Sequence, residues 1–264
     1  MVLLVVAMVV PLIGGYLMSL ERAAVPTVAE PIYNGPEDGK RVALTINVDW
    51  GEEYLPAVLE TCKLKNVKLT FFVTGRWAAK FPDLVKQMAA AGHEIGSHGY
   101  AHPHPDHLSV DGNMRDIQKA EEVLQDILGV KPRLYAPPYG ERGNAVLLAA
   151  EQLGYKTILW SVDSVDWKYR DQRAIIKRVT RKIHPGGIVL MHPTAATAAA
   201  LPDLIDELRM QGYEVRTVSE LLEQGKGPDN AGPLLIVGAY LGYAVKRGAD
   251  CRIFMERREL LVWR

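Results

Sequence analysis

Short β-rich runs alternate with helical stretches along most of this chain, and this alternation restricts the possible folds more than any other feature. Repeated strand and helix units favour parallel strands covered by helices, and their number suits a barrel better than a small open sheet. We therefore expect an α/β fold, a (β/α) barrel in a single main domain. Strands are expected at about 42–49, 69–74, 93–97, 133–136, 157–162, 187–191 and 213–218, and helices at about 53 onward, 77 onward, 111–128, 144–153, 172–183 and 199–211.

The alternating pattern occupies residues 41–225, which we expect to form the folded domain. Residues 23–40 before it are rich in proline and glycine, which indicates a linker. Residues 226–264 after it hold a short apolar run and then a basic stretch. A helix packed on the domain, an interfacial segment and a poorly ordered tail are all open for this C-terminal extension.

The first segment of the chain is apolar. Residues 2–20 carry no charge, which is about the length that a helix needs to cross a bilayer. We predict that residues 1–22 are an export signal or membrane anchor and that the domain is extracytoplasmic, either secreted or anchored in the cell envelope. The alternative is a buried helix, which Pro11 and the Gly14-Gly15 pair disfavour. No lysine or arginine precedes the run, so the usual positive flank is missing.

Charge and cysteine content exclude several other classes. Lysines plus arginines equal aspartates plus glutamates at 31 each, so no net field would attract nucleic acid. The two cysteines, Cys62 and Cys251, lie far apart and belong to no CxxC pair. A nucleic-acid partner and a disulfide-rich scaffold are therefore not expected.

Histidines concentrate where an active site is expected. The chain has 7 histidines, and five of them lie between positions 93 and 107, just after a β-rich run. Loops at the carboxyl ends of parallel strands usually build active sites. His98 and His102 are four residues apart, so one helical turn would direct both imidazoles at one point, as zinc ligation requires. The alternative is a pair of ordinary surface or core histidines.

An acidic third ligand is available at the end of the first strand. Asp49 closes the run, and strand alternation places Asn47 and Asp49 on the same face as Thr45. If that face points inward, an Asp-His-His set leaves one position open for water, as in catalytic zinc sites. The alternative role for Asp49 is a helix N-cap or turn residue before Gly51.

Six segments then follow one another in a distinctive order. They are 44–51 (LTINVDWG), 70–75 (TFFVTG), 98–103 (HGYAHP), 136–140 (APPYG), 163–167 (DSVDW) and 190–192 (LMH). This series, within residues 41–225, resembles the motifs of polysaccharide deacetylases, the NodB-homology domains of carbohydrate esterase family four. The resemblance implies a distorted (β/α) barrel that holds Zn²⁺ or another divalent metal. It also implies removal of acetyl groups from N-acetylated sugars of peptidoglycan or chitin-like polymers.

By this resemblance, Asp49, His98 and His102 match the metal ligands, although the aspartate requires a one-residue shift inside the first motif. His192 matches the histidine that protonates the departing amine. The alternative for His192 is a hydrogen-bonded histidine at a strand end.

The resemblance also assigns the surroundings of that histidine. Either Asp166 or Asp163 matches the acidic group that orients it. Tyr139, Trp167 and Pro138 would line the sugar groove, and the alternative for Trp167 is a plain core aromatic. The partner implied is an N-acetylated, peptidoglycan-like glycan.

Two positions depart from the family pattern. Asn47 stands where the family has the aspartate that takes a proton from water, and an amide cannot accept a proton at neutral pH. Ala136 stands where the family has the arginine that holds this aspartate. Glu52 and Glu53 could replace the base, but acidic first-turn helix residues are the simpler account.

Two hypotheses follow from these losses. The chain is either a metal-dependent deacetylase with reduced activity, or an inactive homologue that binds glycan or an envelope partner. His104 and His107 could also act as replacement bases, although surface histidines are the simpler account. The Trp50-Gly51 pair resembles the sporulation-associated branch of the family, which suggests spore or cell-wall peptidoglycan by analogy.

Overall fold

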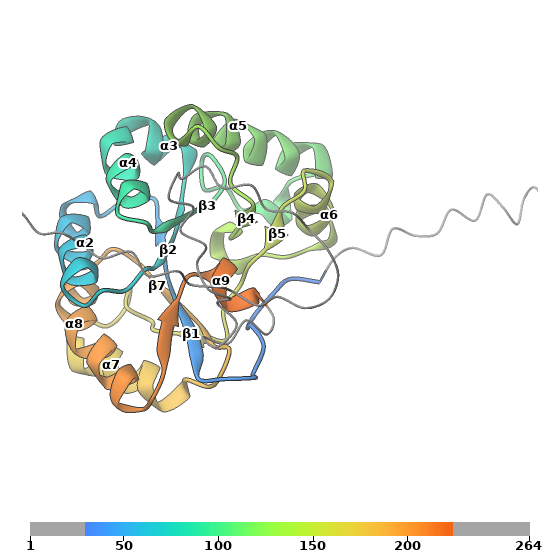
Figure 1. Cartoon of the computed structure of the whole chain (residues 1–264). Helices are drawn as coiled ribbons and strands as arrows, with labels where there is room; N and C mark the ends of the chain where they lie inside the picture. The colour runs from blue at the N-terminus through green and yellow to red at the C-terminus, as the bar shows by residue number, and fades with distance from the viewer. Residues whose placement is uncertain (1–29, 224–264) are drawn as a thin grey trace, which may run out of the picture. The chain divides into compact units, whose positions relative to one another are not determined.

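The computed structural model describes residues 30–223, which form an eight-stranded parallel sheet curled inside a ring of helices (Figure 1). The predicted (β/α) barrel class is confirmed. The strands are β1 (Arg41–Val48), β2 (Thr70–Val73), β3 (Glu94–Ser97), β4 (Leu134–Tyr135), β5 (Lys156–Thr157), β6 (Val162–Asp163), β7 (Ile188–Met191) and β8 (Glu214–Arg216). The helices are α2 (Leu55–Leu64), α3 (Gly75–Lys80), α4 (Pro82–Ala90), α5 (Val110–Leu128), α6 (Asn144–Gln152), α7 (Gln172–Lys182), α8 (Ala195–Met210) and α9 (Val218–Leu222), with 3₁₀ turns at Glu52–Tyr54, Pro105–His107 and Pro138–Gly140.

The barrel is open between two strands that follow each other in the chain. The strand order is β5-β4-β3-β2-β1-β7-β6, and β8 pairs with β1 outside this path. The single strand predicted at 157–162 is therefore wrong, because β5 and β6 stand at opposite edges of the sheet. Residues 158–161 cross the gap between the edges. Their apolar side chains reproduce a strand-like pattern in sequence although they form no continuous ladder with either edge.

Strand alternation separates two packing layers. On β1, the side chains of Leu44, Ile46 and Val48 face outward into the core under the helices. Ala43 lies on the opposite face and packs inside the barrel with Ile188 of β7. Thr45 also lies on this inner face, where its hydroxyl donates to the Val189 carbonyl at 2.9 Å. Asn47 and Asp49 continue the inner series, as the sequence predicts.

The amino-terminal ends of the strands are closed by two segments. Helix α9 lies in front of the strands in Figure 1, and its Val218 and Leu221 join the inner apolar cluster. The backbone N–H of Ile32 donates to Thr157 at 2.9 Å, and Gly35 donates to Gly186 at 2.7 Å. Residues 30–35 of the range predicted as a linker are thus bonded to the sheet, and the opposite, carboxyl ends remain available for a site.

Several predictions concern segments that the structure does not describe. The predicted anchor at 1–22, residues 23–29 of the predicted linker and the extension at 226–264 lie outside the described residues. Among the helices within 30–223, none has the length and hydrophobicity needed to cross a bilayer.

A buried histidine makes the barrel sensitive to acid. His93 is 6% exposed, and its Nδ1 accepts a hydrogen bond from the Leu69 N–H at 3.1 Å. Burial, with a smaller effect of the Lys68 charge, lowers the pKa of His93 from 6.5 to about 4. The unfolded chain therefore binds more protons than the native chain between these values, and stability falls as the pH drops from 6.5 toward 4.

We expect His93→Gln to flatten this pH dependence by at most about 1.4 kcal/mol per pH unit, because glutamine does not titrate. Urea unfolding at pH 7, 5.5 and 4.5 measures the slope for both proteins. Equal slopes for the variant and the wild type would show that His93 is not the titrating group.

Candidate active site

Polar side chains converge at the carboxyl ends of the parallel strands. Because alternate residues share a face, the inner layer of each strand continues into its following loop. The residues that reach this end from the inner layer are Asn47 near the end of β1, Asp49 after β1, Thr74 after β2, His98 after β3, Ala136 after β4 and His192 after β7. Sequence positions far apart are thereby brought to one end of the barrel, where such folds place their active sites.

Two histidines, one buried and one partly exposed, lie together in the site. The ring centroids of His98 and His102 are 4.9 Å apart at an angle of 74°. Nδ1 of His98 lies 2.6 Å from the Ala136 carbonyl, which can only accept, so Nδ1 carries the proton and Nε2 keeps its lone pair. Burial, together with the nearby His102, lowers the pKa of His98 to about 3. His98 is therefore neutral at pH 7, as a metal-ligating imidazole must be.

The loop around these histidines is not the predicted helical turn. Gly99 and His102 have φ values of 74° and 54°, which a right-handed helix does not permit. Instead, Asp116 of α5 accepts a hydrogen bond from the Tyr100 N–H at 2.9 Å and holds the loop. The helical expectation for 98–102 is wrong, although the two rings still meet.

Asp49 is held by partners that the sequence does not reveal. Its Oδ1 accepts hydrogen bonds from the Thr74 hydroxyl and from Nε of Arg76, both at 2.7 Å. A second Arg76 nitrogen pairs with Oδ2. Burial raises the pKa of Asp49, but the Arg76 and Thr74 hydrogen bonds outweigh it, so its pKa lies below the usual value. Asp49 is an ionised carboxylate whose two oxygens are both engaged.

The residues present fit a divalent cation only in part. Neutral imidazoles such as those of His98 and His102 suit zinc, but the carboxylate of Asp49 is paired with Arg76. Within residues 30–223, no three His, Cys, Asp or Glu side chains are arranged to hold a metal ion. The donor set as it stands is incomplete for a cation, and the ligand roles of these three residues stay predictions.

An imidazole and carboxylate pair lies across the site. Nδ1 of His192 is 2.8 Å from Oδ1 of Asp166, whose side chain is 0% exposed. The other oxygen accepts from the His192 backbone N–H at 2.5 Å and from the Thr197 hydroxyl at 2.6 Å. Asp163, the sequence alternative, instead accepts from the Val165 N–H at 2.8 Å. Asp166 is thus the aspartate that holds His192, and it leaves Nε2 of the ring to exchange a proton.

Two uncharged residues lie across the site from His192 and Asp166. Asn47 is 7% exposed, and Ala136 is 3% exposed and packs in the inner apolar cluster. Glu52, a possible replacement base, accepts a hydrogen bond from the Trp77 indole at 3.3 Å, while Glu53 is exposed. His104 is bonded to Glu141 at 2.7 Å. The two positions at which the resemblance implies a base and its arginine partner therefore hold an amide and a methyl group.

Aromatic side chains border the site. Trp50 is 46% exposed, and its ring lies parallel to that of His192 at a centroid distance of 6.4 Å. Tyr139 is 57% exposed and stacks on His104 at 4.0 Å. Trp167 is 62% exposed. The sequence predicts Tyr139 and Trp167 as groove residues but misses Trp50, which its position directly after Asp49 could have indicated.

Unusual backbone conformations gather in these loops. Within the described residues, the non-glycine positions with positive φ are Asn66, His102, Tyr139 and Val165, and all but Asn66 lie in loops at the site. A β-branched residue such as Val165 at φ 56° is strained, and strain of this kind concentrates at functional sites. Pro138, predicted to line the groove, is buried beneath the rim.

Gly51 positions the Trp50 ring. Its φ is 82°, and a Cβ added there would lie 2.1 Å from the Pro193 carbonyl oxygen. Only glycine permits this approach, which brings the loop after β1 against the residue that follows His192. The Trp50-Gly51 sequence therefore fixes an aromatic ring beside the imidazole.

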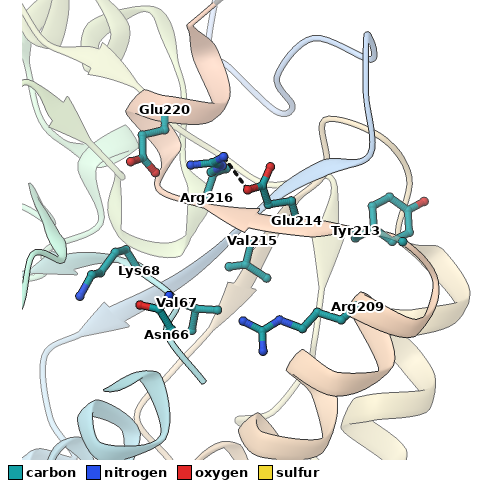
Figure 2. A pocket seen from close by; sticks show the side chains of 10 residues that line it. Asn66, Val67, Lys68, Arg209, Tyr213, Glu214, Val215, Arg216 and Glu220 are labelled. Carbon is teal, nitrogen blue, oxygen red and sulfur yellow. Dashed lines mark ion pairs between the residues drawn. The ribbon is translucent and has the colours of Figure 1, made fainter. Parts of the chain in front are cut away.

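A separate pocket lies at the other end of the barrel. Figure 2 shows its charged lining, with Arg216 paired to Glu214 and Lys68 and Arg209 nearby. Tyr213 and the residues around Lys68 precede β8 and β2, so the pocket lies at the amino-terminal ends of the strands. It shares no lining residue with the site described above.

Comparisons with known proteins agree with the geometry. The polysaccharide deacetylase family model matches residues 34–158. The uncharacterized protein YlxY of Bacillus subtilis is 40% identical over 195 residues, covering 74% of this chain and 61% of YlxY. A peptidoglycan-N-acetylglucosamine deacetylase of Bacillus cereus is 35% identical over 199 residues, covering 74% of this chain and 72% of that enzyme.

Among solved structures, BA3943 of Bacillus anthracis, a CE4 family pseudoenzyme, aligns with a TM-score of 0.72 at 43% identity. The alignment covers 74% of this chain and 69% of BA3943. A BA3943 mutant with restored enzymatic activity aligns equally well, with a TM-score of 0.72 at 42% identity. The fold therefore resembles that of a pseudoenzyme of this family and of its mutant with restored enzymatic activity.

Proposed function

Since the chain belongs to the polysaccharide deacetylase family, we propose that its barrel binds N-acetylated peptidoglycan glycan with hydrolysis lost or strongly reduced. The substrate class is supported by the relatives, which include peptidoglycan deacetylases specific for N-acetylglucosamine and for N-acetylmuramic acid. The reduced activity is supported by the site, and by the likeness to a pseudoenzyme of the same family.

One observation carries the proposal: the side of the site with His192 is complete, whereas the side with Asn47 and Ala136 lacks a base. The His192–Asp166 pair keeps every hydrogen bond that an acid-donating imidazole needs. Asn47 and Ala136 occupy the base side, where an amide cannot accept a proton. Such a site can donate a proton from His192 but cannot take a proton from water. It can still form hydrogen bonds to a sugar.

The chain's own residues suggest how a glycan is held. Trp50, Tyr139 and Trp167 offer exposed ring faces on which the apolar face of a pyranose can stack. Nε2 of His192 can hydrogen-bond a sugar or acetamide group, since Nδ1 is committed to Asp166. Binding therefore needs neither the missing base nor a cation.

Replacing Trp50 by alanine is expected to weaken peptidoglycan binding by about two- to tenfold, the loss of one aromatic stacking contact. Co-sedimentation with purified peptidoglycan, titrated over protein concentration, measures the effect. Tyr213→Leu, at the opposite end of the barrel, is the matched aromatic control and should bind as the wild type does. Equal affinity of Trp50→Ala and wild type would show that Trp50 does not stack on the glycan. Failure of the wild-type protein to sediment with peptidoglycan would contradict the proposal itself.

A second candidate is zinc-dependent deacetylation of the same glycan. The imidazole pair favours it, because the His98 tautomer leaves Nε2 free and His102 lies against it. Acetate release from N-acetylglucosamine oligomers that is abolished by chelation and by His98→Ala would support this candidate. No acetate above blank at high protein and added zinc would exclude it.

The proposed substrate also bears on location. Peptidoglycan lies outside the cytoplasm, which agrees with an export signal or anchor at residues 1–22. Cell wall or spore cortex is the proposed setting. Accessibility of the tagged domain to protease in intact protoplasts tests it, and protection of the domain until lysis would contradict it.

A further inference from the structure

We infer that the guanidinium group of Arg76, by pairing with the carboxylate of Asp49, keeps the affinity of the site for divalent metal ions low. The two side chains form a two-point contact: Nε donates to Oδ1 at 2.7 Å, and a terminal nitrogen pairs with Oδ2. A guanidinium in this geometry matches a carboxylate better than any other side chain. Neither oxygen of Asp49 is left without a partner.

The pair is fixed by the chain rather than formed by chance at the surface. Thr74 caps the start of α3 and donates its hydroxyl to Asp49 at 2.7 Å. The Arg76 backbone N–H donates to the Tyr100 carbonyl at 3.1 Å, which ties the first turn of α3 to the histidine loop. Asp49 is 13% exposed, so water competes little for its oxygens.

A divalent cation would have to compete with this pair. A cation on Asp49 would either displace the guanidinium or share the carboxylate with it, and both arrangements place a second positive centre beside Arg76. The remaining donors, His98 and His102, are two neutral imidazoles, which alone make an incomplete site. The pairing with Arg76 therefore explains why Asp49 is not arranged with His98 and His102 as a set of metal ligands.

The inference rests on the proposed function only in taking His98 and His102 as the imidazoles that face the cation. Glycan binding does not enter it. A zinc titration without glycan tests the role of Arg76, and a peptidoglycan titration without metal tests glycan binding. A negative result in one leaves the other hypothesis unaffected.

The test is a Zn²⁺ titration of the full chain by calorimetry, with Co²⁺ absorption as a second readout of ligand geometry. Arg76→Gln removes the charge but keeps a hydrogen-bond donor, and Arg76 is 47% exposed, so the fold should tolerate the change. Zinc is expected to bind this variant about 10- to 100-fold more tightly than wild type, because one charged hydrogen-bond pair is no longer in competition. The stoichiometry should be one ion per chain.

Arg216→Gln is the matched control, since Arg216 also pairs with a carboxylate, is 39% exposed and lies at the other end of the barrel. It should bind zinc as the wild type does. Adding Asp49→Asn to Arg76→Gln should abolish the gain. Circular dichroism confirms that each variant is folded. Equal zinc affinity in folded Arg76→Gln and wild type, or a gain that survives Asp49→Asn, would overturn the inference.

Discussion

Acetate release from N-acetylglucosamine oligomers is expected to rise by about 100- to 10,000-fold when Asn47→Asp and Ala136→Arg are combined with Arg76→Gln. The first change supplies a carboxylate where the chain has an amide, and the second supplies the cation that holds it in place. The third frees Asp49 from its guanidinium partner. The gain should be measured with added zinc, as the initial rate of acetate formation.

The matched control keeps Asn47 and carries only Ala136→Arg and Arg76→Gln. It shares the changes at positions 76 and 136 but lacks the new carboxylate at position 47 and so has no general base, and its rate should therefore stay at the wild-type level. A control that releases acetate as fast as the triple variant would show that proton abstraction is not the missing step.

Asp166→Ala is expected to lower the free energy of unfolding by about 3–5 kcal/mol, because it leaves three hydrogen-bond donors around a buried position without their acceptor. Asp166 accepts from the His192 ring, the His192 backbone and the Thr197 hydroxyl, and its side chain is 0% exposed. All three donors would lose their partner at once. Urea unfolding at pH 7 measures the loss.

Asp163→Ala is the control for this loss, because Asp163 ends β6 three residues before Asp166 and its side chain accepts a local backbone hydrogen bond from Val165. Its cost should be about 1 kcal/mol. Comparable losses for the two aspartates would mean that Asp166 does not anchor His192. This comparison also decides between the two aspartates that the sequence leaves open.

Much of the fold could be predicted because the sequence shows the alternation of side chains that is typical of strands. Alternation along β1 and β7 places Asn47, Asp49 and His192 on the inner face, and the clusters of buried side chains agree. The split of 157–162 into β5 and β6 could not be predicted, since apolar residues that cross a gap in the sheet resemble a strand. Which strands pair depends on tertiary contacts, and the pattern of apolar residues along the sequence does not indicate these contacts.

The site shows a similar limit. Strand ends indicate His98, His102 and His192, but the partner of Asp49 lies in the first turn of α3, which follows another strand. Arg76 follows Gly75 directly after β2, and a charged residue at that end of a parallel sheet could have drawn notice. The identity of its partner depends on which loops meet in space.

The most direct test of the account is the acetate that the wild-type protein releases from peptidoglycan to which it is bound. The bound fraction and the free acetate are measured in the same sample with zinc present. We expect saturable binding with acetate at least about 100-fold below that of the triple variant. Wild-type release at the rate of the triple variant would contradict it.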